Sequence, residues 1–350
     1  MQNWSIKLFN SVLGGGISSH VFEKLITLDN LFLAWSEFKK GKTKRKDVQE
    51  FEFNLEDNIF QIYHELKNKT YCHSNYTSFY IQDPKLRHIH KAKVRDRIVH
   101  HLISKYLQKI YNKTFIFDSY SCRINKGTHK AVKRLRKFSL KLSKNNKTNF
   151  YVLKCDIKRF FDTIDHNILF KILKQKIKDK NILWLIKEII NSFHKNLNKA
   201  IPLGNLTSQH FANIYLNQFD QFTKHKLKVK YYIRYTDDFV VLDKSKEYLE
   251  NIVSPINEFL ENQLKLSLHP DKIIIRKYNQ GIDFLGYITL PYHRILRTKT
   301  KKRMFRRINN KNIQSYLGIL KHCNGYKLRK KMEKEVFFDQ EKISLAIKKI

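Results

Sequence analysis

Residues 231–242, Tyr-Tyr-Ile-Arg-Tyr-Thr-Asp-Asp-Phe-Val-Val-Leu, place two adjacent carboxylates between two apolar runs. The runs 231–233 and 239–242 have the length and the aromatic and β-branched content of strands. Two strands this close in sequence predict a hairpin with Asp237 and Asp238 at its tip. An Asp-Asp pair alone is more often a turn former than a metal ligand. The pair therefore gains meaning only from other residues of the chain.

A third carboxylate, Asp156, follows a second apolar run far upstream. Residues 150–155, Phe-Tyr-Val-Leu-Lys-Cys, predict a buried strand, and an unpaired carboxylate at its end would be costly. The intervening chain is long enough for helices that return a second strand beside the first. Three acids on rigid strand ends are what a two-Mg²⁺ site for in-line nucleotidyl transfer requires. The nearby Asp162 and Asp165 are weaker candidates, because Asp165 is expected to cap a helix over 168–177.

The charge of the chain indicates a polyanionic partner. Lys and Arg number 69 against 31 Asp and Glu, which gives a formal net charge of +38 over 350 residues. An excess of this size repels itself unless a polyanion neutralises it, and nucleic acid is the natural partner because phosphate contacts release counterions. A membrane surface is the rival reading, but no apolar run reaches the roughly 18–20 residues of a spanning helix.

The N-terminal sequence and the spacing of the cysteines indicate where in the cell the protein is expected to act. Residues 1–20 show neither a signal-peptide core nor an Arg-rich transit pattern. The four cysteines are far apart, with no paired spacing typical of disulfides or zinc, so a reducing, cytoplasmic location is expected. They are Cys72, Cys122, Cys155 and Cys323.

The pattern along the chain predicts a mixed α+β protein. Helices are expected over 25–69, interrupted by the basic stretch 39–46, followed by a strand at 76–81 and a turn at Asp83-Pro84. A helix with one basic face is predicted from His88 to Leu107, and a second basic helix runs from 126 to 142. Strands alternate with helices over 150–290, and a basic helical tail follows Pro291.

Several ordered motifs resemble those of reverse transcriptases over residues 25–335. The palm motifs are matched by Asp156 with Phe160-Phe161, the Leu203-Gly204 loop, Tyr235-Thr236-Asp237-Asp238, residues 268–272 (Leu-His-Pro-Asp-Lys) and residues 284–287 (Phe-Leu-Gly-Tyr). Residues 95–101 and 117–123 resemble fingers motifs. The resemblance implies a right-hand polymerase fold with an antiparallel palm sheet, packed helices and a helical thumb. The expected division is 1–75 N-terminal helical extension, 76–149 fingers, 150–290 palm with finger insertions, and 291–350 thumb and tail.

The resemblance also implies a role for each matching residue. Asp156, Asp237 and Asp238 hold two Mg²⁺ ions, and Lys272 protonates the leaving pyrophosphate. Arg123 clamps the incoming triphosphate, and Phe161 acts as the steric gate against a ribose 2′-hydroxyl, with plain core packing as the alternative. Further nucleotide contacts fall on Leu203, Gly204 and Gln209, and template or primer contacts on Lys93, Arg95, Arg97, Phe284, Leu285 and Gly286. For the three basic residues a solvated helix face is the alternative.

Residues 201–213 resemble one subfamily in particular, the reverse transcriptases of diversity-generating retroelements. Enzymes resembling those of group II introns have glutamine where this chain has Leu203. Leucine neither donates nor accepts a hydrogen bond, so discrimination of a poorly paired base should fall. The subfamily implies error-prone copying of a template-repeat RNA opposite adenines. It implies an RNA template, a DNA or RNA primer, deoxynucleoside triphosphates and an oligomeric accessory variability protein as partners.

Three alternatives remain at this point. The chain is also compatible with a reverse transcriptase of another prokaryotic type, from a retron, a phage-defence system or a group II intron-like element. A non-catalytic RNA-binding protein that kept the fold is a second class, opposed by the three intact acids. An RNA-templated RNA polymerase is the third, opposed by Phe161.

Overall fold

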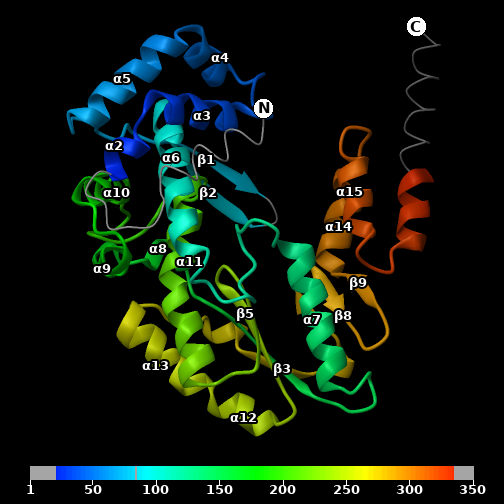
Figure 1. Ribbon diagram of the computed structural model, residues 1–350. Helices are drawn as coiled ribbons and strands as arrows, with labels where there is room; N and C mark the ends of the chain where they lie inside the picture. The colour runs from blue at the N-terminus through cyan, green and yellow to red at the C-terminus, as the bar shows by residue number, and fades with distance from the viewer. Residues whose placement is uncertain (1–20, 83–84, 335–350) are drawn as a thin grey trace, which may run out of the picture. The chain divides into compact units, whose positions relative to one another are not determined.

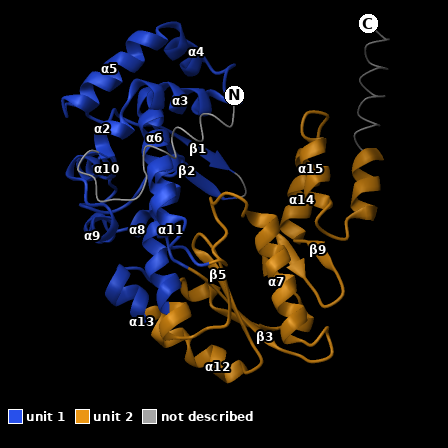
Figure 2. Ribbon diagram, viewed as in Figure 1, with its two compact units in different colours: residues 1–116, 157–222, 258–267 blue, residues 117–156, 223–257, 268–350 orange. Residues whose placement is uncertain are grey.

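The computed structural model describes residues 21–82 and 85–334 (Figure 1). The predicted turn at Asp83-Pro84 and the features predicted for residues 1–20 lie outside these ranges. The chain forms two compact units, each built from discontinuous segments (Figure 2). Unit 1 comprises residues 1–116, 157–222 and 258–267, and unit 2 comprises residues 117–156, 223–257 and 268–350. None of the helices within the described ranges combines the length and hydropathy needed to cross a bilayer.

Unit 1 is mainly helical. Its helices are α2 (Val21–Leu25), α3 (Leu28–Lys39), α4 (Lys46–Phe53), α5 (Leu55–Lys67), α6 (Val94–Tyr111), α8 (Phe160–Thr163), α9 (His166–Lys176), α10 (Lys180–Asn191) and α11 (Leu206–Gln221), and α13 (Val253–Leu264) crosses the unit boundary. Helix α6 packs against α3 and α11, and its apolar residues at helical spacing, such as Ile98 and Leu102, are fully buried. The predicted cap at Asp165 is confirmed, because its carboxylate accepts the backbone N–H groups of Asn167 and Ile168.

The prediction of one helix from His88 to Leu107 was wrong in its first part. Residues 86–91 form strand β2 (Leu86–Lys91), which pairs antiparallel with β1 (Thr77–Gln82), and the helix begins only at Val94. Cross-strand pairing overrides the helical pattern here. The rings of Tyr80 and His88 stack 4.4 Å apart, and Lys91 forms an ion pair with Asp47 of α4 at 2.8 Å. Lys91 therefore lies on a strand and not on the basic face of a helix.

The loop 201–205 is fastened to β2 within unit 1. The backbone N–H of His90 donates to the carbonyl of Leu203 at 2.9 Å. The Asn205 amide bridges the strand end, donating to the His90 carbonyl and accepting from the Ala92 N–H. Gly204 has φ +113°, and a Cβ placed there would lie 2.8 Å from Cγ2 of Ile89. A side chain at position 204 is therefore disfavoured both by backbone conformation and by the close approach to β2.

Unit 2 is organised around an antiparallel sheet in the order β4-β5-β3-β6. Its strands are β3 (Tyr151–Asp156), β4 (Tyr231–Tyr235), β5 (Asp238–Asp243) and β6 (Ile274–Lys277). The strands predicted at 150–155, 231–233 and 239–242 are thus present, and β3 and β5 lie in the centre of the sheet with almost every residue between their end residues buried. The expected mixed helix-and-sheet class with an antiparallel sheet is confirmed.

Helices and a second sheet complete unit 2. Its remaining elements are α7 (Thr128–Leu142), α12 (Lys246–Asn251), β7 (Ile282–Phe284), β8 (Tyr287–Thr289), β9 (Arg294–Leu296), α14 (Thr298–Arg307) and α15 (Ile313–Leu320). Helix α7, labelled in Figure 1, contacts β4, β5 and β8. Its apolar face, including Leu135, therefore joins one core with residues of both sheets. This core includes Val152 of β3 and Val240 and Leu242 of β5, the two strands that carry Asp156 and Asp238.

Replacing Gly204 by alanine should lower the free energy of unfolding by about 1–3 kcal/mol, because it combines an unfavourable φ with a contact to Ile89. Gly127→Ala is the matched control: its φ is +103°, but an added Cβ would meet nothing within 4 Å. With ψ 177°, Gly127 lies in a region that essentially only glycine adopts, so the control bears a backbone cost of roughly 1–3 kcal/mol without the contact and should lose less stability than Gly204→Ala. Denaturant unfolding of both variants measures the difference, and equal losses would contradict the proposed contact.

Candidate active site

The predicted hairpin carries its acids as expected. Strands β4 and β5 pair up to Tyr235 opposite Asp238, which leaves Thr236 and Asp237 as a two-residue loop. Thr236 has φ +55°, the left-handed conformation that such short hairpin loops require. Asp237 therefore lies at the tip, and Asp238 is the first residue of β5.

Asp156 lies directly across the sheet from Asp238. The two residues are Cα partners in the antiparallel pairing of β3 with β5. Directly opposed residues of antiparallel strands present their side chains on the same face, with Cβ atoms about 4.5–5.5 Å apart. The sheet therefore brings two of the three predicted acids together, and the chain connection adds Asp237 next to them.

Lys272 reaches the same group of acids. It ends a short 3₁₀ turn, Pro270–Lys272, which is held to β3 because the His269 N–H donates to the Asp156 carbonyl at 2.8 Å. The Lys272 Nζ atom lies 2.8 Å from Oδ1 of Asp156. The sequence-predicted proton donor is thus in direct ionic contact with a predicted metal ligand.

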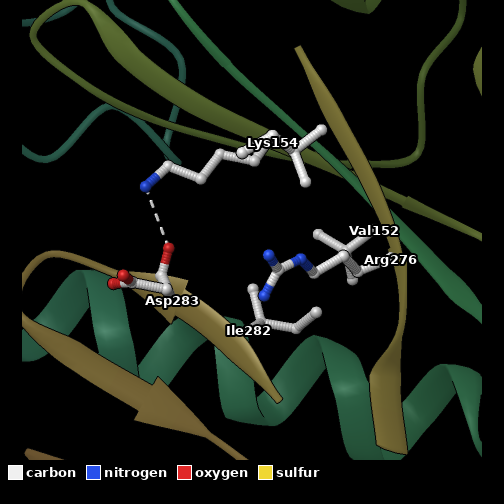
Figure 3. Close-up of a pocket in the computed structure, with 6 residues that line it drawn as sticks. Val152, Lys154, Arg276, Ile282 and Asp283 are labelled. Carbon is white, nitrogen blue, oxygen red and sulfur yellow. Dashed lines mark hydrogen bonds between the residues drawn. The ribbon is translucent and has the colours of Figure 1, made fainter. Parts of the chain in front are cut away.

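A second lysine, Lys154, was not singled out from the sequence. It lies two residues before Asp156 on β3, and its Nζ is 3.6 Å from Oδ2 of Asp238. The same ammonium donates to the backbone carbonyl of Asp283 at 2.9 Å, as the dashed line in Figure 3 shows. Its signal in the sequence was a charged residue inside an otherwise apolar strand.

Lys154 also borders a cavity of about 110 Å³ between β3, β6 and β7 (Figure 3). The cavity is lined by Val152, Lys154, Ile274, Arg276, Ile282 and Asp283. Asp283 in turn forms an ion pair with Arg297, whose Nε lies 2.6 Å from its Oδ1. Charged groups thus link β7 and the start of α14 to the strand that carries Asp156.

Burial dominates the electrostatics of Asp238. It raises the pKa of this carboxyl to about 7, and the negative charges of Asp156 and Asp237 push it in the same direction, while Lys154 and Arg297 oppose them. Within the described part of the chain, Oδ1 of Asp238 is buried without a hydrogen-bond partner. A buried carboxylate oxygen with no donor is an energetic cost that a bound cation would remove.

The donor set fits divalent cations that prefer oxygen ligands. Asp156, Asp237 and Asp238 supply only carboxylates, the ligands that Mg²⁺ takes together with water and substrate phosphates. Among residues 21–82 and 85–334, no three His, Cys, Asp or Glu side chains are already gathered in a form that would hold a metal ion.

Arg123 belongs to a segment, residues 117–123, that runs beside β4. Its Nη1 donates to the Ser119 carbonyl at 2.9 Å, and its side chain is partly exposed. The segment is attached to β4 through Arg234, which the sequence analysis did not single out. Like Lys154, Arg234 is a charged residue inside an apolar strand pattern.

The other predicted nucleotide contacts lie in unit 1. Phe161 is partly buried in α8, its ring 5.4 Å from that of Phe160 in an edge-to-face arrangement. Its backbone carbonyl accepts from the N–H of Ile201, so Phe161 is joined to the loop that carries Leu203 and Gly204. Gln209 is exposed on the first turns of α11. Phe161 and the loop are thus joined within unit 1, and Gln209 lies in the helix that follows the loop.

The predicted template-contacting residues have different environments. Lys93 is exposed at the N-terminal end of α6. Arg95 forms an ion pair with Glu65, and Arg97 forms one with Asp47. Burial lowers the pKa of the Arg97 guanidinium despite that partner. Neither arginine thus occupies a fully solvated helix face, the alternative considered for them.

The predicted primer-contacting residues form the β7–β8 hairpin. Phe284 pairs with Tyr287, and Leu285 and Gly286 form its two-residue loop with φ values of +52° and +88°. Phe284 is fully buried in the core of unit 2. Leu285 and Gly286 are partly exposed, although Leu285 also packs against this core.

Comparison with known proteins identifies the family. The family described as "Reverse transcriptase (RNA-dependent DNA polymerase)" matches residues 81–289, more than half of the chain. The chain belongs to this reverse transcriptase family. The match includes all four residues predicted to be catalytic, as well as the Leu203-Gly204 loop and the β7–β8 hairpin.

The individual relatives share about a quarter of their residues with this chain over the aligned regions. Protein YkfC of Escherichia coli (strain K12) is 27% identical over 256 residues, covering 62% of this chain and 65% of that protein. Group II intron-encoded protein LtrA of Lactococcus lactis subsp. cremoris is 25% identical over 304 residues, covering 66% and 49%. Apo telomerase from Candida tropicalis aligns with a TM-score of 0.49 at 14% identity, over 63% of this chain and 48% of that one. The chain thus spans less than two thirds of the length of these curated relatives.

The Asp238→Asn variant should be more stable than the original chain in metal-free buffer, and more so at pH 8 than at pH 5. The folded-state pKa of about 7 lies above the unfolded value, so folding stability is highest at low pH and is lost as pH rises toward 7. Removing the titratable group should therefore gain about 2 kcal/mol more at pH 8 than at pH 5. Denaturant unfolding in EDTA measures it, and a pH-independent difference would contradict the raised pKa.

Proposed function

We propose that this protein is an RNA-directed DNA polymerase that copies a template-repeat RNA into cDNA in a diversity-generating retroelement. The observation that carries the catalytic part is the direct pairing of Asp156 with Asp238 beside Asp237, with Lys272 2.8 Å from Asp156. Membership of the reverse transcriptase family supports the same reaction. The Leu203-Gly204 loop and the subfamily pattern around it support the retroelement type.

The proposed chemistry assigns each residue a task. Asp156, Asp237 and Asp238 would hold two Mg²⁺ ions, which when bound supply charge neutralisation on the pyrophosphate and a lower pKa for the primer 3′-hydroxyl. Lys272 is positioned by its contact with Asp156 and would donate a proton to the departing pyrophosphate. Arg123 would clamp triphosphate oxygens with its planar fork. Lys154 would hold Asp238 oriented and partly offset its charge.

Specificity is assigned to unit 1. Phe161, on the segment that hydrogen-bonds to the 201–205 loop, would exclude the ribose 2′-hydroxyl and so favour deoxynucleotides. Leu203, Gly204 and Gln209 would contact the nucleotide, with Leu203 lowering base discrimination. Lys93 and the arginines at 95 and 97 would serve template contact, directly or by fixing the start of α6. Phe284, Leu285 and Gly286 would contact the primer.

The partners proposed are an RNA template, a DNA or RNA primer and an oligomeric accessory variability protein. The net charge of +38 supports the nucleic-acid partners, because binding would release counterions from the phosphates. We also propose that the predicted division into N-terminal extension, fingers, palm and thumb holds, and that the protein acts in the cytoplasm.

A second candidate is a reverse transcriptase of another prokaryotic type. The similarity to an intron-encoded protein favours a group II intron-like element. A near-identical pair of repeats beside the gene, differing mainly at adenines, would favour the diversity-generating type. Primer extension on RNA decides the activity: deoxynucleotides should be incorporated and ribonucleotides rejected, and sequencing with and without the accessory protein should show errors opposite adenines.

Asp237→Asn should reduce cDNA synthesis by on the order of 10³-fold, because it removes one of three anionic ligands at the site. RNA binding, measured by filter retention, should remain within about twofold, since most affinity comes from phosphate contacts. Asp243→Asn, at the far end of β5, is the matched control and should keep normal synthesis. Full activity of Asp237→Asn would refute the proposed catalytic role.

Leu203→Gln should reduce misincorporation opposite template adenines by up to about tenfold, because glutamine restores a hydrogen-bonding group worth about 1 kcal/mol. The fold should be unaffected, since position 203 contacts β2 through its backbone carbonyl. Leu203→Met, which keeps an apolar side chain of similar volume, should leave the error spectrum unchanged. Sequenced cDNA libraries measure both variants, and an unchanged error rate for Leu203→Gln would remove Leu203 as a determinant of fidelity.

A further inference from the structure

Arg234 belongs to unit 2. It is the penultimate residue of β4, directly before Tyr235, and its side chain is fully buried. Burying a guanidinium is costly unless hydrogen bonds satisfy its donors. The contacts that this side chain makes therefore indicate what it does.

The guanidinium joins two segments that are far apart in sequence. Its Nη1 donates to the backbone carbonyl of Thr236 at 3.0 Å, in the hairpin loop beside Asp237. Its Nη2 donates to the Ser119 hydroxyl at 3.2 Å, in the segment 117–123. One planar fork thus spans the loop that carries the acids and the segment that carries Arg123.

The backbone of Arg234 strengthens the same junction. Its N–H donates to the Asp118 carbonyl, and its carbonyl accepts from the Tyr120 N–H, both at 3.0 Å. The segment is thereby aligned parallel to β4 at Ser119. Side chain and backbone together fix the register of 118–120 against the catalytic hairpin.

The loop residue held by Arg234 is in a disfavoured conformation. Thr236 has φ +55°, which is an outlier for a β-branched residue and costs on the order of 1–3 kcal/mol. Two contacts secure it, since Arg234 binds its carbonyl and its hydroxyl donates to the Ser121 hydroxyl at 2.7 Å. Ser121 belongs to the same segment as Ser119. The strained loop is therefore held in place from the segment 117–123.

Arg123 is connected to this junction through Ser119. The Ser119 carbonyl accepts from Nη1 of Arg123 at 2.9 Å, while its hydroxyl accepts from Arg234. A continuous series of hydrogen bonds thus runs from Thr236 through Arg234 and Ser119 to Arg123. A shift of the hairpin tip at Thr236 would therefore also move Arg123.

The geometry points to Arg234 as a positioning residue that couples the placement of the catalytic hairpin loop to that of Arg123. It acts through its hydrogen bonds to the Thr236 carbonyl and the Ser119 hydroxyl. The consequence for catalysis rests on the proposed polymerase function. The hydrogen-bonded coupling itself does not.

Lysine cannot replace this side chain, because a single ammonium on a flexible stem does not reproduce two bonds at a fixed angle. Arg234→Lys keeps the positive charge and most of the volume. It should lower kcat for nucleotide addition about tenfold and raise the KM for deoxynucleotide about threefold or more. In metal-free protein, amide hydrogen exchange in residues 231–242 should be about tenfold faster, because the loop is less constrained.

Ser119→Ala tests one side of the connection. It removes the side-chain bond from Arg234 to the Ser119 hydroxyl but leaves the bond to the Thr236 carbonyl and the backbone bonds to residues 118 and 120. The KM for deoxynucleotide should rise about threefold to tenfold with kcat within about twofold of the original. A purely structural role would not separate KM from kcat in this way. Ser119→Ala also decides the matter if Arg234→Lys fails to fold.

Arg294→Lys is the matched control for the general effect of replacing a buried arginine by lysine. Arg294 is also buried in unit 2 and also donates to backbone carbonyls, those of His322 and Val132. It should lower the thermal midpoint about as much as Arg234→Lys while leaving hydrogen exchange at 231–242 unchanged. Acceleration there in both variants would show general loosening and overturn the proposal.

Two further results would overturn the positioning role of Arg234. One is a kcat and a KM of Arg234→Lys that are both within twofold of those of the unsubstituted protein, and the other is unchanged hydrogen exchange at 231–242 in a folded variant. If the unsubstituted protein makes no cDNA on any RNA template, the proposed function is refuted instead. The exchange measurement needs no substrate, so the two failures are distinguishable.

Discussion

The main constraint on unit 2 is the proximity of three carboxyl groups. The antiparallel pairing of β3 and β5 places Asp156 opposite Asp238, with Asp237 beside them. Like charges this close repel more strongly as the surroundings become less polar. The fold offsets part of the repulsion with cations from separate elements, Lys154 on β3 and Lys272 on its 3₁₀ turn. Burial is the largest cause of the raised pKa of Asp238, and the negative charges of Asp156 and Asp237 add to it. A bound divalent cation would lower both the cost of burying this carboxylate and the repulsion.

The hairpin and the position of Asp156 followed from the sequence because they are local. Apolar runs that end in acids predict strand ends, and the turn chemistry of residues 235–238 fixes where the chain reverses. The register that pairs Asp156 with Asp238 is a tertiary property that no local pattern encodes. The same holds for Lys154 and Arg234. Each was visible as a charge within an apolar strand, but only the fold shows that one reaches Asp238 and the other Thr236.

The error at His88–Lys91 has the same physical origin. Basic and apolar residues spaced as on a helix face continue from 88 into the true helix α6, so the local signal does not reveal the boundary. Pairing with β1, the stacking of Tyr80 on His88 and the hydrogen bond from His90 to Leu203 decide the strand. The β1 partners are near in sequence and Leu203 is far, but the propensity of residues 88–91 alone senses neither contact.

The loop at 201–205 is attached to β2 by groups other than the side chain of Leu203, so under the proposed function its specificity would vary independently of stability. Leu203 is tied to β2 through its carbonyl, a group present in every residue, and Asn205 and Gly204 supply the side-chain bond and the close approach. The side chain at 203 contributes to neither of these hydrogen bonds. A change from a polar to an apolar residue there can therefore alter what the loop recognises while the loop keeps its attachment. Substitutions at 204 and 205 should therefore weaken the attachment of the loop to β2, whereas substitutions at 203 should not.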